Sequence, residues 1–457
     1  MEAEAAELSA QESTFAFRVR GIVLVLAAGL SVRLILATLP GFAIDLGSFQ
    51  GWANQLAHDG PWNFYKSDFF TDYAPGYMYV LLAIGKLHQW FNFSQDEYNY
   101  VLKLPSIAAD LGSAYLLYRL VKERSVEMAL GSAALYLLFP AALWIGPIWG
   151  QVDSLLALFL LLSIYFISQD RPVAGAVAYT VGFLTKPQAV AALPFLTFWI
   201  MRERWPKWSE RGPELWEPLK LWLKCGAAAL AVLLILVIPF FTYKPWELID
   251  QLNDATNVYK ANSFWAYNFW NMFENYGFRC DVSSGCAPGA PTSEFLGVAT
   301  RFWGFLLFGL SVAAIIGLLR NNRSTGGLAL GTALCVFAFY LFLTRMHERY
   351  VFAFFLPFLA ACALIQSRAL WAAFAGLGAV HFFNLYHVYI YYWSFNYPNR
   401  PQELKVDPFY SWFEDSSFLG SGLDTIQVLS ILMVGGFLVL LGLAYHVGSR
   451  RVQATAT

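Results

Sequence analysis

Charged residues are scarce in this sequence. Asp, Glu, Lys and Arg make up 13% of the 457 residues, about half of the share found in an average soluble protein. This composition excludes a soluble enzyme, a disordered chain and a disulfide scaffold. The formal net charge of −1 leaves no basic field that would recruit nucleic acid. The sequence also has no internal repeat, heptad run, low-complexity tract or nucleotide-binding glycine motif.

Apolar and aromatic residues are abundant instead. Hydrophobic residues make up 58% of the chain and aromatic residues 18%, and the mean hydropathy is +0.49. This composition is typical of an all-α polytopic membrane protein, because apolar runs of about 20 residues cross a bilayer as helices. About twelve such helices are expected, near residues 21–40, 101–121, 127–146, 152–168, 173–186, 187–201, 219–242, 299–319, 327–343, 350–366, 369–392 and 424–447. The fifth and sixth are too short to span alone, so we expect two half-length helices that meet at Lys186.

The Lys and Arg residues of the short loops predict the orientation of the chain. These residues all fall on one side if both termini are cytoplasmic, which gives a cytoplasmic tail at 1–20 and a cytoplasmic loop at 202–218. The first apolar run is then a retained helix and not a cleaved signal peptide. The run at 76–87 must be an interfacial helix, since counting it as a span would invert every later loop. External loops are therefore expected at 41–100, 243–298, 344–349 and 394–422.

The five cysteines divide into two groups. Three of them, Cys225, Cys335 and Cys362, lie within predicted spans and are expected to be packing thiols. The other two, Cys280 and Cys286, lie in an expected external loop. An oxidising exterior would favour a disulfide between them, although the sequence leaves this pairing open.

Several charged residues gather near the predicted outer face. They come from distant parts of the chain: Asp45, Asp72, Asp153, Lys186 and the 344–350 segment, Thr-Arg-Met-His-Glu-Arg-Tyr. A charged side chain at membrane depth is costly, so each one is a candidate for function. A carboxylate can take a proton from a hydroxyl, and Lys and Arg can stabilise a leaving phosphate. The combination predicts a wet cavity that binds a lipid-phosphate substrate.

Each of these residues also has a purely structural interpretation. Asp45 fits as the N-cap of a helix that begins at Leu46, and Asp153 fits as a cap for the fourth span. Asp72 could simply form a turn, and Lys186 could extend to the interface. The segment 347–349 could be an ordinary polar turn with an internal ion pair. Arg33, inside the first span, could extend to the interface or pair with a lipid phosphate.

The ordered motifs resemble those of the GT-C superfamily of integral-membrane glycosyltransferases. Asp45 stands where this superfamily has an acidic residue soon after the first helix. Residues 72–77 (Asp-Tyr-Ala-Pro-Gly-Tyr) stand where the same loop has an Asp-Tyr-Pro-Pro-Leu-like motif, with Ala and Gly as departures. Residues 151–154 (Gln-Val-Asp-Ser) match the acidic motif of the second external loop. Residues 186–188 resemble a Lys-Gln-Met turn with Pro inserted, and residues 347–349 resemble a His-Glu-Lys turn.

This resemblance implies a fold and a reaction. It implies a GT-C-like fold with a catalytic membrane module at 21–201, juxtamembrane helices in the first external loop, and further helices at 219–450. The implied reaction transfers a hexose, mannose or glucose with mannose favoured, from a polyprenyl-phosphate donor to a hydroxyl of a glycan, lipid or protein, with inversion. The setting would be a bacterial plasma membrane with the site facing outward. No cofactor and no metal are required, although a divalent cation held by Asp153 is an alternative.

The resemblance also suggests roles for individual residues. Asp45 would be the catalytic base. The donor phosphate would be bound by Lys186, Arg345, His347 and Arg349. The sugar or the acceptor would be oriented by Asp72, Tyr73, Gln151, Asp153 and Glu348.

A different class of function is a transporter or flippase of lipid-linked saccharides, which also needs a wet cavity with charges. Transporters commonly have internal repeats and a site at the midplane of the bilayer. This sequence has no repeat, and its charges lie near one face. These two features favour a glycosyltransferase over a transporter or flippase.

Overall fold

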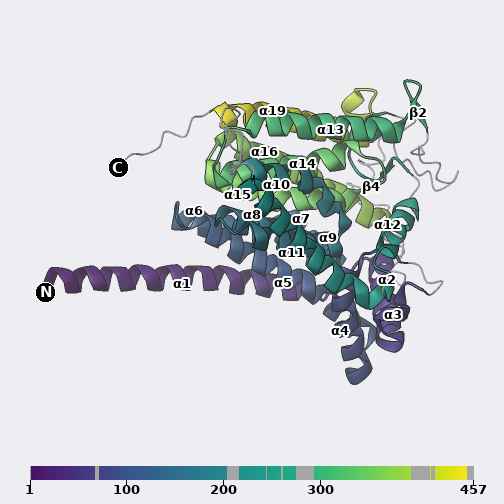
Figure 1. Cartoon of the computed structure of the whole chain (residues 1–457), viewed down its shortest axis with the longest axis horizontal. Helices are drawn as coiled ribbons and strands as arrows, with labels where there is room; N and C mark the ends of the chain where they lie inside the picture. The colour runs from purple at the N-terminus through teal and green to yellow at the C-terminus, as the bar shows by residue number, and fades with distance from the viewer. Residues whose placement is uncertain are drawn as a thin grey trace.

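The computed structural model describes residues 2–66, 71–202, 216–242, 244–258, 261–273, 293–392, 412 and 417–449, with side chains from residue 19 on. Its long helices lie side by side in one bundle (Figure 1). Cys225, Cys335 and Cys362 are buried free thiols, as predicted. Cys280 and Cys286 lie outside the described residues.

The described segments confirm an all-α membrane protein. Seven helices are long and apolar enough to cross a membrane, or eight if one bent pair counts as a span. They are α1 (Glu2–Leu36, from Val19), α11 (Trp216–Phe241), α13 (Thr300–Leu319), α14 (Thr325–Phe342), α15 (Phe352–Ile365, with the preceding turn), α16 (Arg368–Tyr391) and α19 (Thr425–Ser449). Among these, α14 and α15 are largely buried in the centre, whereas α1 and α11 are mostly exposed to the surroundings of the bundle.

The expected number of about twelve spans is not confirmed, although all twelve predicted segments are helical. α5 (Gln95–Val121) carries Lys103 and Asp110 in its interior. α8 (Asp153–Ser168) and α9 (Pro172–Thr185) have 16 and 14 residues. η2 (Pro187–Ala192) is a 3-10 turn that leads into α10 (Leu193–Arg202). As predicted, the chain breaks at Lys186, which is extended (φ −143°, ψ 115°) between α9 and η2.

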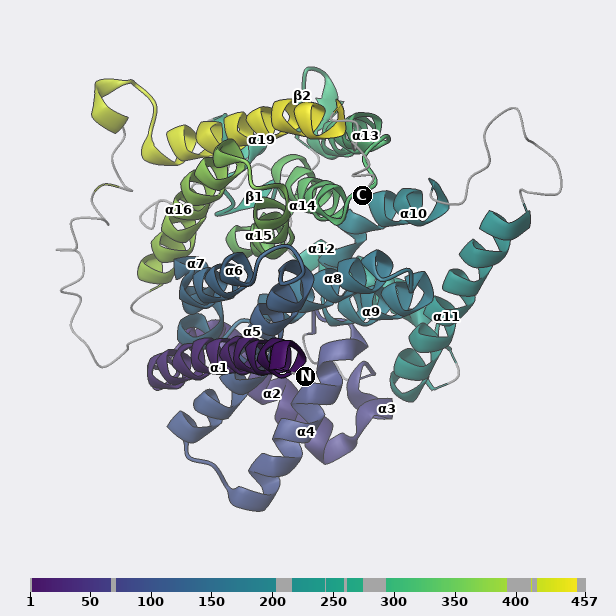
Figure 2. The same cartoon turned by 90° about the vertical axis from the view of Figure 1, so that its left-hand side faces the viewer.

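The first loop folds into three helices at one end of the bundle. They are α2 (Ala43–Asp59), α3 (Pro61–Phe64) and α4 (Pro75–Phe91). α4 runs across the direction of α1 (Figure 1), and Figure 2 shows all three to one side of the bundle. Gly85 lets α4 approach α2 closely, because a Cβ there would lie 2.1 Å from the carbonyl oxygen of Ala53. These are the predicted juxtamembrane helices, and the apolar run at 76–87 belongs to α4.

A bent segment leads from the bundle to this end of the molecule. α6 (Val126–Leu138) is followed by α7 (Pro140–Leu143) and by η1 (Trp144–Trp149), which is a π-helix. The direction changes by 48° at the break. Pro140 explains the bend, because the residue before a proline avoids the helical region, and Phe139 is indeed extended. Gly150 then ends η1 with φ of 95°, a conformation that glycine adopts without strain.

Short elements join the second half of the chain to the same end. They are α12 (Glu247–Val258), β1 (Ser263–Phe264), η5 (Phe269–Met272), β2 (Glu294–Phe295), β3 (Val298–Ala299), β4 (Met346–His347), η6 (Glu348–Val351) and η8 (Phe418–Gly420). β1 pairs in parallel with β4, which places Phe264 opposite His347, while β2 pairs antiparallel with β3. α12 and β4 lie near α2, whereas α1 begins at the opposite end (Figure 1).

A buried ion pair fixes the start of the bundle. The Arg33 Nε lies 2.9 Å from Asp110 Oδ2, and neither side chain is exposed. Tyr136 donates to the other carboxylate oxygen at 2.9 Å, and Arg33 also donates to the Leu137 carbonyl at 2.7 Å. Arg33 therefore joins α1 to α5 and α6, and both interfacial interpretations of it are wrong.

We predict that Asp110→Ala strongly destabilises the protein, because it leaves the Arg33 charge buried without a partner. The expected loss is about 3–5 kcal/mol, seen as a lower midpoint of thermal unfolding in detergent. Asp59→Ala removes an exposed aspartate of α2 and serves as the control. The double variant Arg33→Met/Asp110→Leu should recover most of the midpoint, since an apolar pair can replace a buried ion pair. Equal midpoints for Asp110→Ala and Asp59→Ala would contradict the prediction.

Candidate active site

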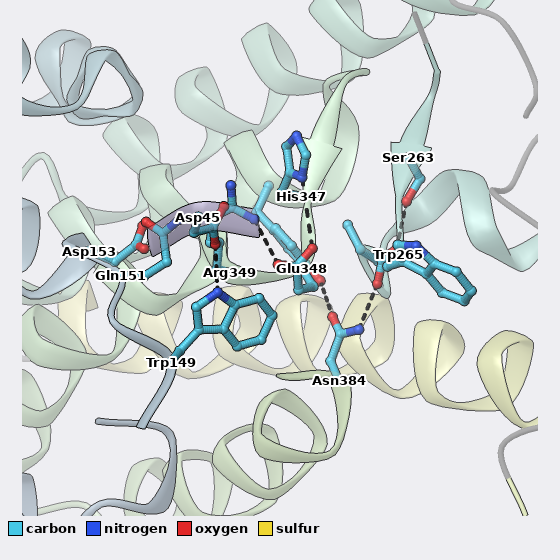
Figure 3. Close-up of polar contacts among 12 residues, drawn as sticks. Asp45, Trp149, Gln151, Asp153, Ser263, Trp265, His347, Glu348, Arg349 and Asn384 are labelled. Atoms are coloured by element: carbon cyan, nitrogen blue, oxygen red, sulfur yellow. Dashed lines mark hydrogen bonds and ion pairs between the residues drawn. The ribbon is translucent and has the colours of Figure 1, made fainter. Parts of the chain in front are cut away.

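Asp45 lies in the first turn of α2 and is half-buried. The helix begins at Ala43 after Phe42, so Asp45 is inside the helix and the interpretation as an N-cap is wrong. Its Oδ2 accepts a hydrogen bond of 2.6 Å from the indole Nε1 of Trp149 (Figure 3). Its negative charge also acts on the guanidinium of Arg349.

A second buried ion pair lies beside Asp45. Lys186 Nζ is 2.8 Å from Asp153 Oδ1 and donates to Gln151 Oε1 at 3.3 Å. The Tyr73 hydroxyl donates to the same Gln151 oxygen at 3.1 Å, and the Lys186 ammonium lies 5.5 Å from the Tyr73 ring centre. Lys186 is only 3% exposed, so it does not extend to the interface.

Asp153 is the first residue of α8, and Val152 occupies the capping position. The carboxylate of Asp153 is committed to Lys186 through Oδ1, while Oδ2 is buried and has no hydrogen-bond partner among the described residues. In the same part of the chain, no group of three or more His, Cys, Asp or Glu side chains forms a cluster that could hold a metal ion.

The His-Glu-Arg turn brings a further ion pair to the site. Arg349 Nη1 donates to Glu348 Oε1 at 2.9 Å, and His347 Nδ1 lies 3.9 Å from Glu348 Oε2. Strand β1 holds this turn in place, and the Phe264 ring stacks on the His347 ring at 5.1 Å. Asn384 in turn fixes the chain after β1 by donating to the Trp265 carbonyl at 2.6 Å (Figure 3). The turn does contain an internal ion pair, but the pair is buried and not solvated.

His347, which is expected to bind the donor phosphate, carries no charge in this environment. Burial, and then the positive charges of Arg349 and Lys186, hold the pKa of His347 well below its usual value. The imidazole is therefore neutral at pH 7, and it can offer a phosphate a hydrogen bond but no charge.

A cavity of about 530 Å³ adjoins these residues. α12 and the 343–350 segment supply most of its walls, together with η2 and α13. Its polar lining includes Asp72, Gln188, Arg301 and Arg345. Its apolar lining includes Phe183, Val190, Phe305, Phe339 and Leu343. The cavity is thus amphipathic, with two guanidinium groups in its wall.

Arg345 is held in an uncommon conformation in this wall. Its φ is +68°, which few residues other than glycine adopt. Its backbone N–H donates to the carbonyls of Ala261 and Asn262 at 3.0 and 2.9 Å. Burial, and then the positive charge of Arg301, lower the pKa of Arg345. An anion bound between the two arginines would relieve their repulsion.

The predicted site residues thus fall into two neighbouring groups. The central cluster consists of Asp45, Tyr73, Gln151, Asp153, Lys186, His347, Glu348 and Arg349. Asp72 and Arg345 instead line the cavity. The two groups adjoin, because Asp72 precedes Tyr73, and Tyr350, which lines the cavity, follows Arg349.

Sequence reasoning missed two residues of this region. Trp149 directly precedes the Gly-Gln-Val-Asp motif, but the sequence gives no sign that its side chain meets Asp45. Arg301 lies in the first turn of a predicted span. A charge within a span is a recognised signal of function, so Arg301 could have been singled out.

Comparison with known proteins identifies the family. The model of the ALG6, ALG8 glycosyltransferase family matches residues 83–391, more than half of the chain. Two crystal structures of ArnT from Cupriavidus metallidurans, one in the apo state and one bound to undecaprenyl phosphate, share 15% sequence identity, with TM-scores of 0.47 and 0.49. Each likeness covers 93% of this chain and 77% of ArnT.

No curated protein matches the chain. The family match begins after Asp45, Asp72 and Tyr73 and includes all the other predicted site residues. It confirms the resemblance to GT-C membrane glycosyltransferases that the motifs indicated. The chain belongs to the ALG6, ALG8 glycosyltransferase family.

Proposed function

We propose that the protein transfers a hexose from a polyprenyl-phosphate-linked donor to an acceptor hydroxyl, with inversion and with Asp45 as the base. The observation that carries the proposal is the position of Asp45. It is half-buried and it faces Arg349, whose neighbour Tyr350 lines an amphipathic cavity that contains two more arginines. A lipid phosphate is complementary to this lining, because its head is anionic and its chain is apolar.

The proposed reaction transfers the sugar in one displacement. The Asp45 carboxylate takes the proton of the acceptor hydroxyl, while the hydroxyl oxygen forms a bond to the anomeric carbon. The bond between that carbon and the phosphate oxygen breaks, and the lipid phosphate leaves with the electron pair. Attack from the side opposite to the phosphate inverts the anomeric centre. Arg345, Arg349 and Arg301 stabilise the phosphate as its charge grows.

The remaining residues of the central cluster orient the substrates. Lys186 is already paired with Asp153, so it acts on the phosphate as a shared charge and not as a free cation. Glu348 holds Arg349 in place, and His347 offers a neutral N–H. Tyr73 and Gln151 present polar groups for the hydroxyls of the sugar or the acceptor.

The identity of the hexose belongs to the proposal. The sequence favoured mannose, whereas the ALG6 and ALG8 enzymes for which the family is named are glucosyltransferases. Both donors are therefore included in the tests. We also propose that the site faces the exterior and both termini the cytoplasm, on the distribution of Lys and Arg in the loops.

We predict that Asp45→Asn lowers kcat by about 10²–10⁴-fold, the usual contribution of a general base. The amide keeps the shape of the side chain and can still accept from Trp149, so the protein should fold. The assay supplies mannosyl- or glucosyl-polyprenyl phosphate with a membrane extract and identifies the product by mass. Asp59→Asn, at the other end of the same helix, is the control. Full activity of Asp45→Asn would rule out the base, and lipid transport without any product would favour a flippase.

We predict that Arg301→Gln and Arg345→Gln each raise the KM for the donor by roughly 10–100-fold, the value of a charge-assisted hydrogen bond. Inhibition by the sugar-free polyprenyl phosphate should weaken in parallel. Arg320→Gln is the matched control, because Arg320 is an exposed arginine that follows the far end of α13. An unchanged KM and unchanged inhibition in both cavity variants would show that the phosphate binds elsewhere.

A further inference from the structure

The indole of Trp149 makes one polar contact, and that contact is to Asp45. Its ring is fully buried, and Nε1 donates to Asp45 Oδ2 at 2.6 Å. Among the described residues, no hydrogen bond engages the other carboxylate oxygen, Oδ1. The indole therefore occupies one oxygen of Asp45 and leaves the other available to a hydroxyl from the substrate.

The same tryptophan is bound firmly to the start of α2. Its carbonyl accepts from the Phe42 N–H at 2.8 Å, and its ring stacks on that of Phe42 at 4.4 Å with an angle of 21° between the planes. Tyr389 packs against the ring from α16 at 5.8 Å. Backbone and side chain thus hold Trp149 and the first turn of α2 together as a unit.

The π-helix η1 explains how Trp149 reaches this place. An α-helix turns by about 100° for each residue, so a change in winding over Trp144–Trp149 redirects the side chain at its end. π-Helices are rare and are frequently found at functional sites. Immediately after η1, the chain supplies Gln151 and Asp153 to the central cluster. The unusual winding thus delivers three side chains to one place.

We propose that Trp149 is the positioning residue for the base: its indole N–H fixes the Asp45 carboxylate so that Oδ1 faces the acceptor hydroxyl. This inference rests on the proposed function, in which Asp45 takes the acceptor proton. The hydrogen bond also favours the ionised carboxylate, because a donor stabilises the charged form more than the neutral one.

Other groups act on Asp45 and must be kept constant in a test. Arg349 and Glu348 face it from η6, Lys186 faces it from the break between α9 and η2, and Tyr73 faces it from the turn before α4. A substitution at Trp149 changes none of them, so a shift in the pH dependence reports on the indole.

The test compares Trp149→Phe with Trp144→Phe in the full-length protein, with the synthetic donor varied up to saturation at each pH. Trp149→Phe keeps an aromatic ring against Phe42 but loses the donor. We expect kcat to fall about tenfold, the donor KM to stay within about twofold, and the acid limb of kcat to move up by about one pH unit. Trp144 is the matched control on the same π-helix, because its buried Nε1 has no hydrogen-bond partner among the described residues. Trp144→Phe should leave the acid limb in place.

A second replacement at position 149 distinguishes the loss of the hydrogen bond from a change in packing. Introducing 3-benzothienylalanine at position 149 keeps both fused rings and puts sulfur in place of the indole N–H, and it should shift the acid limb by the same amount. In addition, Trp149→Phe should lower kcat no further when Asp45→Asn is already present.

The outcomes distinguish a failure of Asp45 as the base from a failure of Trp149 as its positioning residue. An active Asp45→Asn protein overturns the base and the positioning role together. An inactive Asp45→Asn protein beside a Trp149→Phe protein with an unshifted acid limb overturns the role of Trp149 alone, whether or not kcat has fallen.

Discussion

The ion pair between Lys186 and Asp153 is the interaction on which the site depends. A charge inside a membrane protein is tolerated when it is paired and hydrogen-bonded. Here the charge of each partner offsets the cost of removing the other from water. The pair joins the start of α8 to the break between α9 and η2. Through Gln151 and Tyr73 it also connects the bundle to the first loop. Removing either charge would therefore disturb elements that are distant in the sequence.

The site is a chain of such pairs and not a single cluster around one residue. Lys186 pairs with Asp153 and Arg349 pairs with Glu348, while Arg301 and Arg345 share the neighbouring cavity. The positive charges that already have partners are fixed in position. In the cavity, burial and then the charge of Arg301 disfavour the charged form of Arg345, so an added anion is more favourable there. The paired charges thus fix the shape of the site, whereas Arg301 and Arg345 are the groups placed to bind a ligand.

Parts of this arrangement could be predicted from the sequence. Pro187 has no N–H to continue a helix, so the break at Lys186 followed from local chemistry. The helical segments followed from their length and apolar composition. The sequence could not locate the start of α2 to within three residues. A start at Leu46 would make Asp45 the cap of the helix, whereas the actual start at Ala43 places it inside. The partners of Arg33, Lys186 and Trp149 could not be predicted from the sequence either, because each contact joins segments that only tertiary packing brings together.

The positions of the two chain ends bear on the number of crossings. α1 begins at the end of the bundle where α19 finishes, and α2, α12 and β4 lie at the opposite end (Figure 1). A chain that starts and finishes on one side must traverse the bundle an even number of times. Among the described residues, the seven long helices and the bent pair of α6 and η1 together make eight spans, which is such an even number. The elements that carry Asp45 and His347, α2 and β4, therefore lie at the end of the bundle opposite to the start of α1 and the end of α19.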